Sequence, residues 1–209
     1  IGYLGWWGTH FNGLIDELNV YNTLLSEDEI KQSYLNSVLE KGGIIISFDD
    51  GYSTWKTMAA PVLEKYGGTA TGFIVNKRIG DQITLAEIQS LQNDYHWEIG
   101  SHTYNHVYLE EYLQTHTLQE WINNEIVPSL NDFEQKGLEV NNFAFPGNSY
   151  TNEAIEILLS DYFNTLRGHF TTGDEYLEIG ERKLGGVGLG FAYNNDVEEI
   201  KEMIDYAAE

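Results

Sequence analysis

An isoleucine-rich run that ends in two adjacent carboxylates constrains the fold of this chain more than any other stretch. The run Gly43-Ile44-Ile45-Ile46 leads directly into Ser47-Phe48-Asp49-Asp50-Gly51. Apolar runs of this length are typical of a strand that is buried in a sheet. Asp49 and Asp50 cannot both be buried unpaired, because desolvation and a neighbouring like charge disfavour the ionised form. A cation or a base-catalysed reaction at the strand end would explain the pair, and so would a solvated turn.

A second predicted strand ends in two histidines that are four residues apart. Residues 97–100 form this short strand, and Ser101-His102-Thr103-Tyr104-Asn105-His106 follows it. In a helical turn this spacing places both imidazoles on one face, within reach of one metal ion. Two surface histidines are the plainer interpretation of the pair alone. Two histidines and a carboxylate from another strand end, however, form a recognised zinc ligand set that leaves a position open for water.

The rest of the pattern predicts strands and helices in alternation. The expected strands cover residues 43–46, 69–75, 97–100, 142–145, 162–166 and 183–187, and the expected helices cover residues 54–66, 84–94, 117–136, 151–160 and 196–208. Thr84 with Glu87, and Thr117 with Glu120, are expected to form capping boxes at two helix starts. Such alternation is typical of a parallel sheet or barrel, which places its functional site at the carboxyl ends of the strands.

Composition excludes several classes of function. The 209 residues carry a formal net charge of −22 and no cysteine. A chain this acidic lacks the basic patches that bind nucleic acid or anionic lipid, so neither partner is expected. The acid excess suits solubility, or a neutral or cationic polymer as partner. Without cysteine there is no disulfide framework and no thiolate metal site, and no apolar run is long enough to span a membrane.

Three motifs together resemble those of the polysaccharide deacetylases, carbohydrate esterase family 4. The segments Ser47-Phe48-Asp49-Asp50-Gly51, Ser101-His102-Thr103-Tyr104-Asn105-His106 and Phe143-Ala144-Phe145-Pro146 are similar to the first, second and third motifs of that family. They follow the family's order, and the resemblance covers about residues 42 to 209. It implies an α/β fold, a distorted and incomplete (β/α) barrel of about seven strands, in a deacetylase domain at residues 44–209.

The resemblance also implies roles for individual residues. Asp49 is the expected general base, and Asp50, His102 and His106 are the expected ligands of Zn²⁺ or another divalent transition metal. The backbone N–H of Gly147, directly after the third motif, is the expected donor to the oxyanion. Such a metal lowers the pKa of bound water toward about 7. Asp49 would then take up a proton as this water attacks an acetyl carbonyl.

The third motif departs from the family pattern at two positions. Gly147 stands where the family often has tyrosine, so that an aromatic wall of the acetyl pocket is missing at this position. Ala144 stands where many members carry an arginine that orients the base. Arg167 comes at the end of the predicted strand 162–166. We expect its guanidinium to contact Asp49 in place of the missing arginine and to keep that carboxylate ionised.

The family's late histidine motif, which supplies the general acid, is absent from this chain. The chain ends at Glu209, about where the strand that carries that histidine would begin. We therefore expect the deacetylase domain to be truncated at its C-terminus, with the general acid beyond residue 209. His169 follows a predicted strand and is expected to be a loop residue rather than a substitute acid.

The amino-terminal residues carry a separate pattern. The expected elements are strands at 1–7 and 11–21, a turn at 8–10, a helix from Ser26 to about Ser37 that opens with a capping box to Glu29, and a linker at 39–43. Residues 11–30 resemble the C-terminal end of a laminin-G-like (concanavalin-A-like) sandwich domain. Residues 1–38 would then be a remnant, a β-hairpin plus helix, of a glycan-binding or adhesion module. An extra hairpin of the catalytic domain is the alternative.

The sequence thus favours a metal-dependent hydrolase that removes acetyl groups from a polysaccharide, either an N-acetylglucosamine polymer or an acetylated hemicellulose. The alternative is a non-catalytic carbohydrate-binding or adhesion protein that retains the deacetylase fold. The acid pair and the two histidines favour the enzyme, because binding alone needs no base beside a metal. The resemblance implies an extracellular or cell-envelope location, and the sequence leaves the oligomeric state open.

Overall fold

The computed structural model describes residues 45–168 with their side chains. It also describes residues 24–26 and 29–30, and the backbone of three further two-residue strands. The chain divides into two compact units, Ile1–Gly42 and Gly43–Glu209. The described residues do not include the strand predicted at 11–21, residues 31–37 of the helix predicted from Ser26 to about Ser37, the linker at 39–43, His169 or the helix predicted at 196–208.

The first unit contains a short antiparallel strand pair. β1 (Tyr3–Leu4) pairs with β2 (Thr9–His10), with Tyr3 opposite His10. The predicted turn at 8–10 is therefore wrong, because β2 occupies two of its three residues. Thr9 is β-branched and suits a strand, and this preference outweighs the turn signal of the preceding glycine. That these residues are the remnant of a sandwich domain stays a prediction.

The capping box predicted at Ser26 is present. The Glu29 carboxylate accepts a hydrogen bond from the backbone N–H of Ser26 at 2.8 Å, and the Ser26 hydroxyl accepts one from the backbone N–H of Glu29 at 3.3 Å. The two hydrogen bonds from Ser26 lower the pKa of the Glu29 carboxyl group. These reciprocal hydrogen bonds are the capping pattern predicted for the start of this helix.

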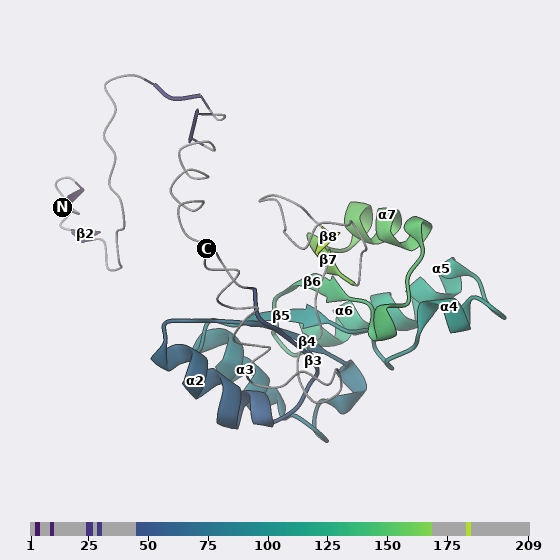
Figure 1. Cartoon of the computed structure of the whole chain (residues 1–209), viewed down its shortest axis with the longest axis horizontal. Helices are drawn as coiled ribbons and strands as arrows, with labels where there is room; N and C mark the ends of the chain where they lie inside the picture. Colours follow the sequence, from purple (N-terminus) through teal and green to yellow (C-terminus); the bar gives the residue numbers. More distant parts are fainter. Residues whose placement is uncertain are drawn as a thin grey trace, which may run out of the picture. The chain divides into compact units, whose positions relative to one another are not determined.

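A parallel sheet organises the second unit (Figure 1). Its strands are β3 (Ser47–Asp50), β4 (Thr71–Ile74), β5 (Glu98–Ser101), β6 (Val140–Ala144), β7 (Thr165–Arg167) and β8 (Lys183–Leu184). Neighbours in the sheet follow sequence order, and every pair is parallel. This singly wound order is that of a (β/α) barrel, whereas a doubly wound sheet reverses its order.

The predicted barrel class is confirmed in a coarser form. The five strands β3 to β7 form an α/β half-barrel, and the two-residue β8 pairs with β7 at its edge. A seventh strand of this sheet is not seen among the described residues. The strand boundaries also shift: β3 begins at Ser47, so both acids lie inside the strand instead of after it. The ladder with β4 continues as far as Asp50, which pairs with Ile74.

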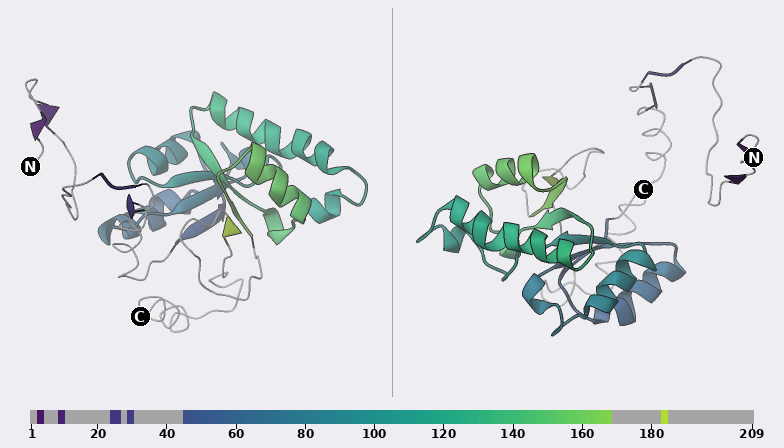
Figure 2. Two further views of the ribbon diagram at one scale, coloured as in Figure 1. Left: turned by 90° about the horizontal axis from the view of Figure 1, so that it is seen from above. Right: turned by 180° about the vertical axis from the view of Figure 1, so that it is seen from behind.

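Helices connect the strands of the second unit. They are α2 (Ala60–Lys65), α3 (Leu85–Asn93), α4 (Leu109–Tyr112), α5 (Leu118–Trp121), α6 (Val127–Gln135) and α7 (Asn152–Asp161), with 3-10 turns η3 (Asn76–Arg78) and η5 (Pro146–Asn148). α2 and α3 lie side by side in Figure 1. Figure 2 shows the sheet between this pair and the teal and green helices α4 to α7. The capping boxes at Thr84 and Thr117 are confirmed. None of the described helices is long and apolar enough to cross a membrane.

Two of the predicted helices contain a widened π-helical turn directly before a proline-containing α-helix. η2 (Trp55–Ala59) precedes α2, and η4 (Ile122–Ile126) precedes α6. The second residue of each following helix is a proline, Pro61 or Pro128. A proline inside a helix lacks the N–H donor and crowds the carbonyl four residues earlier, so a wider turn before it relieves the clash. The predicted spans 54–66 and 117–136 are confirmed as helical, but not as uniform α-helix.

The hydrophobic core consists of two clusters. One packs α2 and α3 against β4 and β5 and includes Trp55, Ile88, Leu91 and Trp97, and the other packs α4 to α7 against β6 and β7 and includes Trp121, Phe143, Phe145 and Leu158. Phe48 of β3 stacks on Trp97, with ring centroids 5.2 Å apart. Burial of large aromatic side chains on both sides fixes the sheet, and the sheet holds the strand ends in place.

One row of paired residues runs across three neighbouring strands and includes Asp49 of the acid pair. Asp49, Phe73 and Gly100 lie opposite one another in β3, β4 and β5. A Cβ atom added at Gly100 would lie 2.5 Å from a ring carbon of Phe73, so glycine leaves the space that this ring fills. The Phe73 ring in turn lies 5.2 Å from the Arg167 guanidinium carbon. A larger residue at position 100 would push Phe73 against its neighbours.

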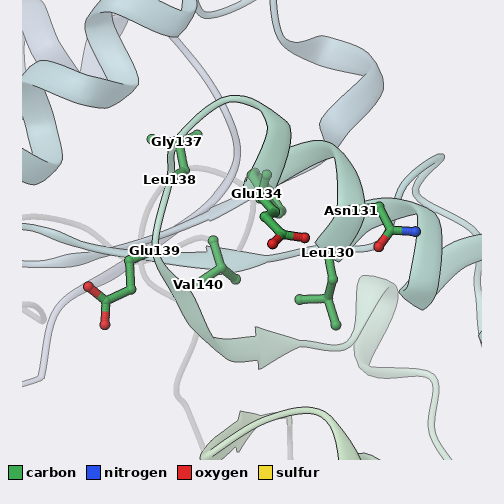
Figure 3. A pocket seen from close by; sticks show the side chains of 8 residues that line it. Leu130, Asn131, Glu134, Gly137, Leu138, Glu139 and Val140 are labelled. Carbon is green, nitrogen blue, oxygen red and sulfur yellow. The ribbon is translucent and has the colours of Figure 1, made fainter.

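A surface hollow lies at the amino-terminal end of β6, away from the carboxyl ends of the strands (Figure 3). Its lining comes from α6 and the turn into β6, namely Leu130, Asn131, Phe133, Glu134, Gly137, Leu138, Glu139 and Val140. Val140 opens β6 and Ala144 closes it. The predicted site residues are therefore not part of this hollow.

We expect Gly100→Ala to destabilise the protein by about 1–3 kcal/mol, because overpacking forces the Phe73 ring from its position. Gly68→Ala is the matched control, since its Cβ would meet nothing closer than 3.6 Å. That change should alter the free energy of unfolding by less than about 0.5 kcal/mol. Urea unfolding curves of the two variants and the parent give the three free energies of unfolding to be compared. Equal midpoints for Gly100→Ala and the parent would contradict the close packing described here.

Candidate metal centre and active site

The two adjacent acids point to different partners. Successive residues of a strand project to opposite faces, so Asp49 and Asp50 diverge although they are neighbours. Asp50 also has a φ of 85°, a left-handed conformation that is uncommon for a residue other than glycine. Asp49 meets Arg167, whereas Asp50 meets Arg78 and the two histidines. The mutual repulsion predicted for the pair is thus relieved by separate cations or hydrogen-bond donors.

The two histidines meet through a loop and not through a helix. Residues 102–108 after β5 have no helical assignment, so the helical turn considered for this spacing is not formed. Thr103 and His106 adopt left-handed conformations with φ of 65° and 68°. The Thr103 hydroxyl accepts a hydrogen bond from the backbone N–H of His106 at 2.9 Å and closes the turn. The result is still the expected proximity, with the two imidazole centroids 5.1 Å apart.

Asp50, His102 and His106 converge as a possible metal site. Asp50 Oδ1 lies 3.2 Å from His106 Nε2 and 3.9 Å from His102 Nε2. One atom from each of the three residues lies within 4.8 Å of the others. Ligands about 2.1 Å from one tetrahedral ion stand roughly 3.4 Å apart, which these separations bracket. Asp50 Oδ1 is buried and is neutralised in part by the Arg78 guanidinium at 2.7 Å, and a carboxylate oxygen held beside two imidazoles is a suitable ligand for a divalent ion.

A hydrogen bond to the backbone fixes which nitrogen of His102 is available. His102 Nδ1 lies 2.8 Å from the carbonyl oxygen of Ala144. A carbonyl can only accept, so Nδ1 carries the proton and Nε2 presents its lone pair toward Asp50. Burial lowers the pKa of His102 to about 4 and also lowers the pKa of His106. Both imidazoles are therefore neutral near pH 7, which is the form that binds a metal.

Arg167 reaches the expected base. Its Nη2 donates a hydrogen bond to Asp49 Oδ1 across the strand ends of β7 and β3. The contact predicted between these two side chains is therefore present, although Arg167 lies within β7 instead of after it. The side chain of Arg167 is 17% exposed and that of Asp49 is 38% exposed. Asp49 is thus held from one side and open to solvent on the other.

Arg78 was missed by the sequence interpretation. Its Nη1 lies 2.7 Å from Asp50 Oδ1 and 3.5 Å from the Asp50 carbonyl oxygen. The residue follows β4 in the 3-10 turn η3. The rule that polar residues after a parallel strand form the site, already applied to β3 and β5, would have pointed to it. Arg78 offsets the negative charge that Asp50 brings to this edge.

A buried glutamate, which the sequence interpretation also missed, supports the loop at residues 102–108 that carries His102 and His106, called the histidine loop below. Glu125 is only 3% exposed. Its carboxylate accepts hydrogen bonds from the backbone N–H of Asn105 at 2.8 Å and from the Asn105 side chain at 2.6 Å. Its carbonyl oxygen accepts one from the backbone N–H of Tyr104 at 3.1 Å. Glu125 sits in the middle of a predicted helix, where no local sequence signal marks it as a loop anchor.

Gly147 lies in the turn η5 that follows β6, with a φ of 59°. Gly147 is only three residues beyond Ala144, the last residue of β6. It therefore lies at the same carboxyl edge of the sheet as Ala144. The predicted donor therefore belongs to the same edge of the sheet as Asp49, Asp50 and His102.

The chain belongs to the polysaccharide deacetylase family, which its sequence matches over residues 37–163. The curated relative YxkH of Bacillus subtilis (strain 168), whose name marks it as a candidate polysaccharide deacetylase, is 36% identical over 92 residues. That match covers 44% of this chain and spans only 33% of the relative's length. The expected enzyme class, a hydrolase of this family, is confirmed at the level of the family.

Several solved structures share the fold. IcaB from Ammonifex degensii gives a TM-score of 0.62 at 18% identity, covering 78% of this chain and 72% of that protein. A de-N-acetylase from Aggregatibacter actinomycetemcomitans gives 0.62 at 18% identity, covering 76% and 73%. The polysaccharide deacetylase BC0361 from Bacillus cereus gives 0.60 at 20% identity, covering 77% and 51%. At these identities the likeness establishes the deacetylase fold and not a substrate.

We expect Glu125→Gln to weaken the histidine loop. A glutamine amide would place an N–H₂ group against one of the two Asn105 donors, and the unsatisfied group should cost about 1–3 kcal/mol of stability. Because Glu125 supports the loop that carries His106, zinc affinity should fall by roughly 10–100-fold. Urea unfolding and a zinc titration against a competing chelator measure the two effects.

Glu64→Gln is the matched control for this variant, because Glu64 is exposed on α2. It should leave both the unfolding midpoint and the zinc affinity unchanged. An unchanged zinc affinity in Glu125→Gln would show that the loop does not depend on this carboxylate.

Proposed function

We propose that this chain is a metal-dependent deacetylase of an acetylated polysaccharide, either an N-acetylglucosamine polymer or an acetylated hemicellulose. The observation that carries the proposal is the convergence of Asp50, His102 and His106 beside an acid, Asp49, that takes no part in the cluster. A pure binding site needs the three ligands but not the separate acid. Membership of the deacetylase family and the shared fold support the same conclusion.

Asp50, His102 and His106 would hold a zinc ion or another divalent transition metal. A divalent ion in this position acidifies water and polarises the acetyl carbonyl. The two neutral imidazoles and one carboxylate leave a net positive charge there, which favours that chemistry. Asp49, exposed to solvent at its free side, accepts a proton from the attacking water. The backbone N–H of Gly147 is the proposed donor to the oxygen that develops negative charge, an interaction worth roughly 3–4 kcal/mol.

Arg167 is a positioning residue in this proposal. Its guanidinium fixes the Asp49 carboxylate by a charge-assisted hydrogen bond, the role that Ala144 cannot perform. The Phe73 ring beneath the guanidinium restricts its movement. Arginine suits the task better than lysine, because its planar group both stacks on the ring and aims a fixed donor.

The alternative, a carbohydrate-binding or adhesion protein without activity, is not favoured. The Asp49–Arg167 pair beside the metal ligands has no function in simple binding. We further propose an extracellular or cell-envelope location, because acetylated polysaccharides occur there. Cell fractionation with an antibody to the chain tests this proposal, and recovery in the cytoplasmic fraction alone would refute it.

We expect His106→Ala to abolish stoichiometric zinc binding while the fold is retained, because His106 is partly exposed and the loss leaves two ligands. His116→Ala is the matched control, since His116 is exposed and stacks on Tyr112 instead. Metal content after dialysis is measured by atomic absorption, with circular dichroism as the check on folding. Full zinc occupancy in the folded His106→Ala variant would exclude the proposed ligand set.

We expect Asp49→Asn to retain zinc and to lose about 10²–10⁴ in the rate of acetate release, the usual contribution of one general base. Asp81→Asn, a change at an exposed acid outside the cluster, should leave the rate unchanged. Acetate released from acetylated chito-oligosaccharides and acetylated xylan by the zinc-loaded protein gives the rate. An Asp49→Asn variant as fast as the parent would mean that another group takes the proton.

The same assay separates positioning by Arg167 from a direct role. Arg167→Ala should slow the parent enzyme, yet it should add little to the loss already caused by Asp49→Asn. Two residues that act through one group are non-additive in this way. Additive losses would show that Arg167 acts independently of Asp49.

A further inference from the structure

The ring of Tyr108 packs next to Gly147, a position that itself has no side chain. A Cβ atom added to Gly147 would lie 3.0 Å from two ring carbons of Tyr108 and 3.3 Å from a third. Contacts this short are tighter than a real Cβ atom normally makes, so the ring fills the space next to the turn. The Tyr108 ring and any side chain at position 147 therefore compete for the same volume.

The same ring also faces the metal site. The Tyr108 ring packs edge-on against the imidazole of His106, with centroids 5.5 Å apart and an interplanar angle of 67°. Edge-to-face packing at this distance is a favourable aromatic arrangement. Tyr108 is 38% exposed, so part of its ring is available to a ligand. It thus lies between the loop that carries a metal ligand and the turn that carries the proposed oxyanion donor.

Hydrogen bonds outside the ring hold these two segments together. The hydroxyl of Ser149, just after the turn η5, accepts a hydrogen bond from the backbone N–H of Glu110 at 2.7 Å and donates one to the Glu110 carboxylate at 3.3 Å. Leu109, between Tyr108 and Glu110, is completely buried. These contacts fix the Tyr108 backbone relative to the turn at 146–148. The ring is therefore held beside Gly147 by the neighbouring residues 109 and 110 as well as by its own contacts.

We propose that Tyr108 is the specificity-determining wall beside the metal site, which admits an acetyl group and excludes longer acyl groups. The inference rests on the proposed function, because it assigns the acyl side of that same site. Because the ring contacts both His106 and the Gly147 turn, it would limit the space for an acyl chain between the metal ligand and the proposed oxyanion donor. One methylene group is commonly discriminated by roughly 10–200-fold in an apolar pocket.

In this assignment the aromatic wall comes from the histidine loop, and Gly147 is the residue that makes room for it. The glycine is thus not simply a lost side chain. Its small size and its φ of 59° both serve the close approach of the Tyr108 ring.

The first test measures how the zinc-loaded 209-residue chain binds three carboxylates, namely acetate, propionate and butyrate. These ions are the products that acyl groups of increasing length would yield, and they bind without any reaction. We expect the parent to bind acetate at least tenfold more tightly than butyrate. Tyr108→Ala should bring this ratio close to one, and Tyr108→Phe, which retains the ring, should preserve it. Tyr66→Ala, a change at an exposed tyrosine next to α2, is the control.

The outcomes separate this inference from the proposed function. If zinc and acetate bind and Tyr108→Ala keeps the parent's preference for acetate, the inference is overturned while the proposed function stands. If the carboxylates bind with the expected selectivity but the parent releases no acetate from acetylated glycans, the wall is supported and the proposed activity fails. If no zinc binds, both are overturned.

A second test needs neither zinc nor activity. Gly147→Ala should lower the melting temperature of the parent more than it lowers that of Tyr108→Ala. The backbone strain of alanine at a positive φ is present in both backgrounds, so the difference reports the contact with the ring. Equal losses in the two backgrounds would show that the ring does not occupy the space beside position 147, and the inference would fail.

Discussion

The hydrogen bond from His102 to the carbonyl oxygen of Ala144 is the contact on which the site depends. It joins the loop after β5 to the last residue of β6 at 2.8 Å. Because the acceptor belongs to the backbone, no substitution at position 144 removes it directly. The bond assigns the proton to Nδ1 and leaves Nε2 directed at Asp50, so the sheet itself selects the tautomer. Burial of the ring keeps the imidazole neutral by lowering its pKa to about 4.

Much of this arrangement is predictable from the sequence, for a physical reason. The carboxyl ends of parallel strands share one edge, so polar residues after separate apolar runs must meet there. This argument brings Asp49, Asp50, His102 and His106 together and also brings Arg167 to the acid. It needs only the order of the elements and not their exact bounds. The shifts of up to four residues at β3 and up to three residues at β7 therefore do not affect the result.

Other features could not be predicted because their causes are not local. The histidine loop takes its shape from Glu125, which lies about twenty residues later on a helix and is recognisable only by its burial. The π-helical turns depend on prolines inside helices whose ends are otherwise well marked. The helical turn considered for the His102–His106 spacing is not needed, because left-handed residues at 103 and 106 achieve the same proximity. Spacing constrains which side chains can meet, but not the backbone path between them.

The backbone strain of the described residues is concentrated at this edge of the sheet. Five residues other than glycine have positive φ, and four of them, Asp50, Thr103, His106 and Asn148, belong to the strand ends that form the site. Such conformations cost of order 1–3 kcal/mol each and persist only where the surroundings determine them. Here the surroundings are specific: the Thr103 hydroxyl closes the turn to His106, and Glu125 holds Asn105 between them. A protein that needed only a stable half-barrel would gain by relaxing these residues. Their joint occurrence around one carboxylate and two imidazoles agrees with the proposed metal site, which would need three ligand atoms held at fixed separations.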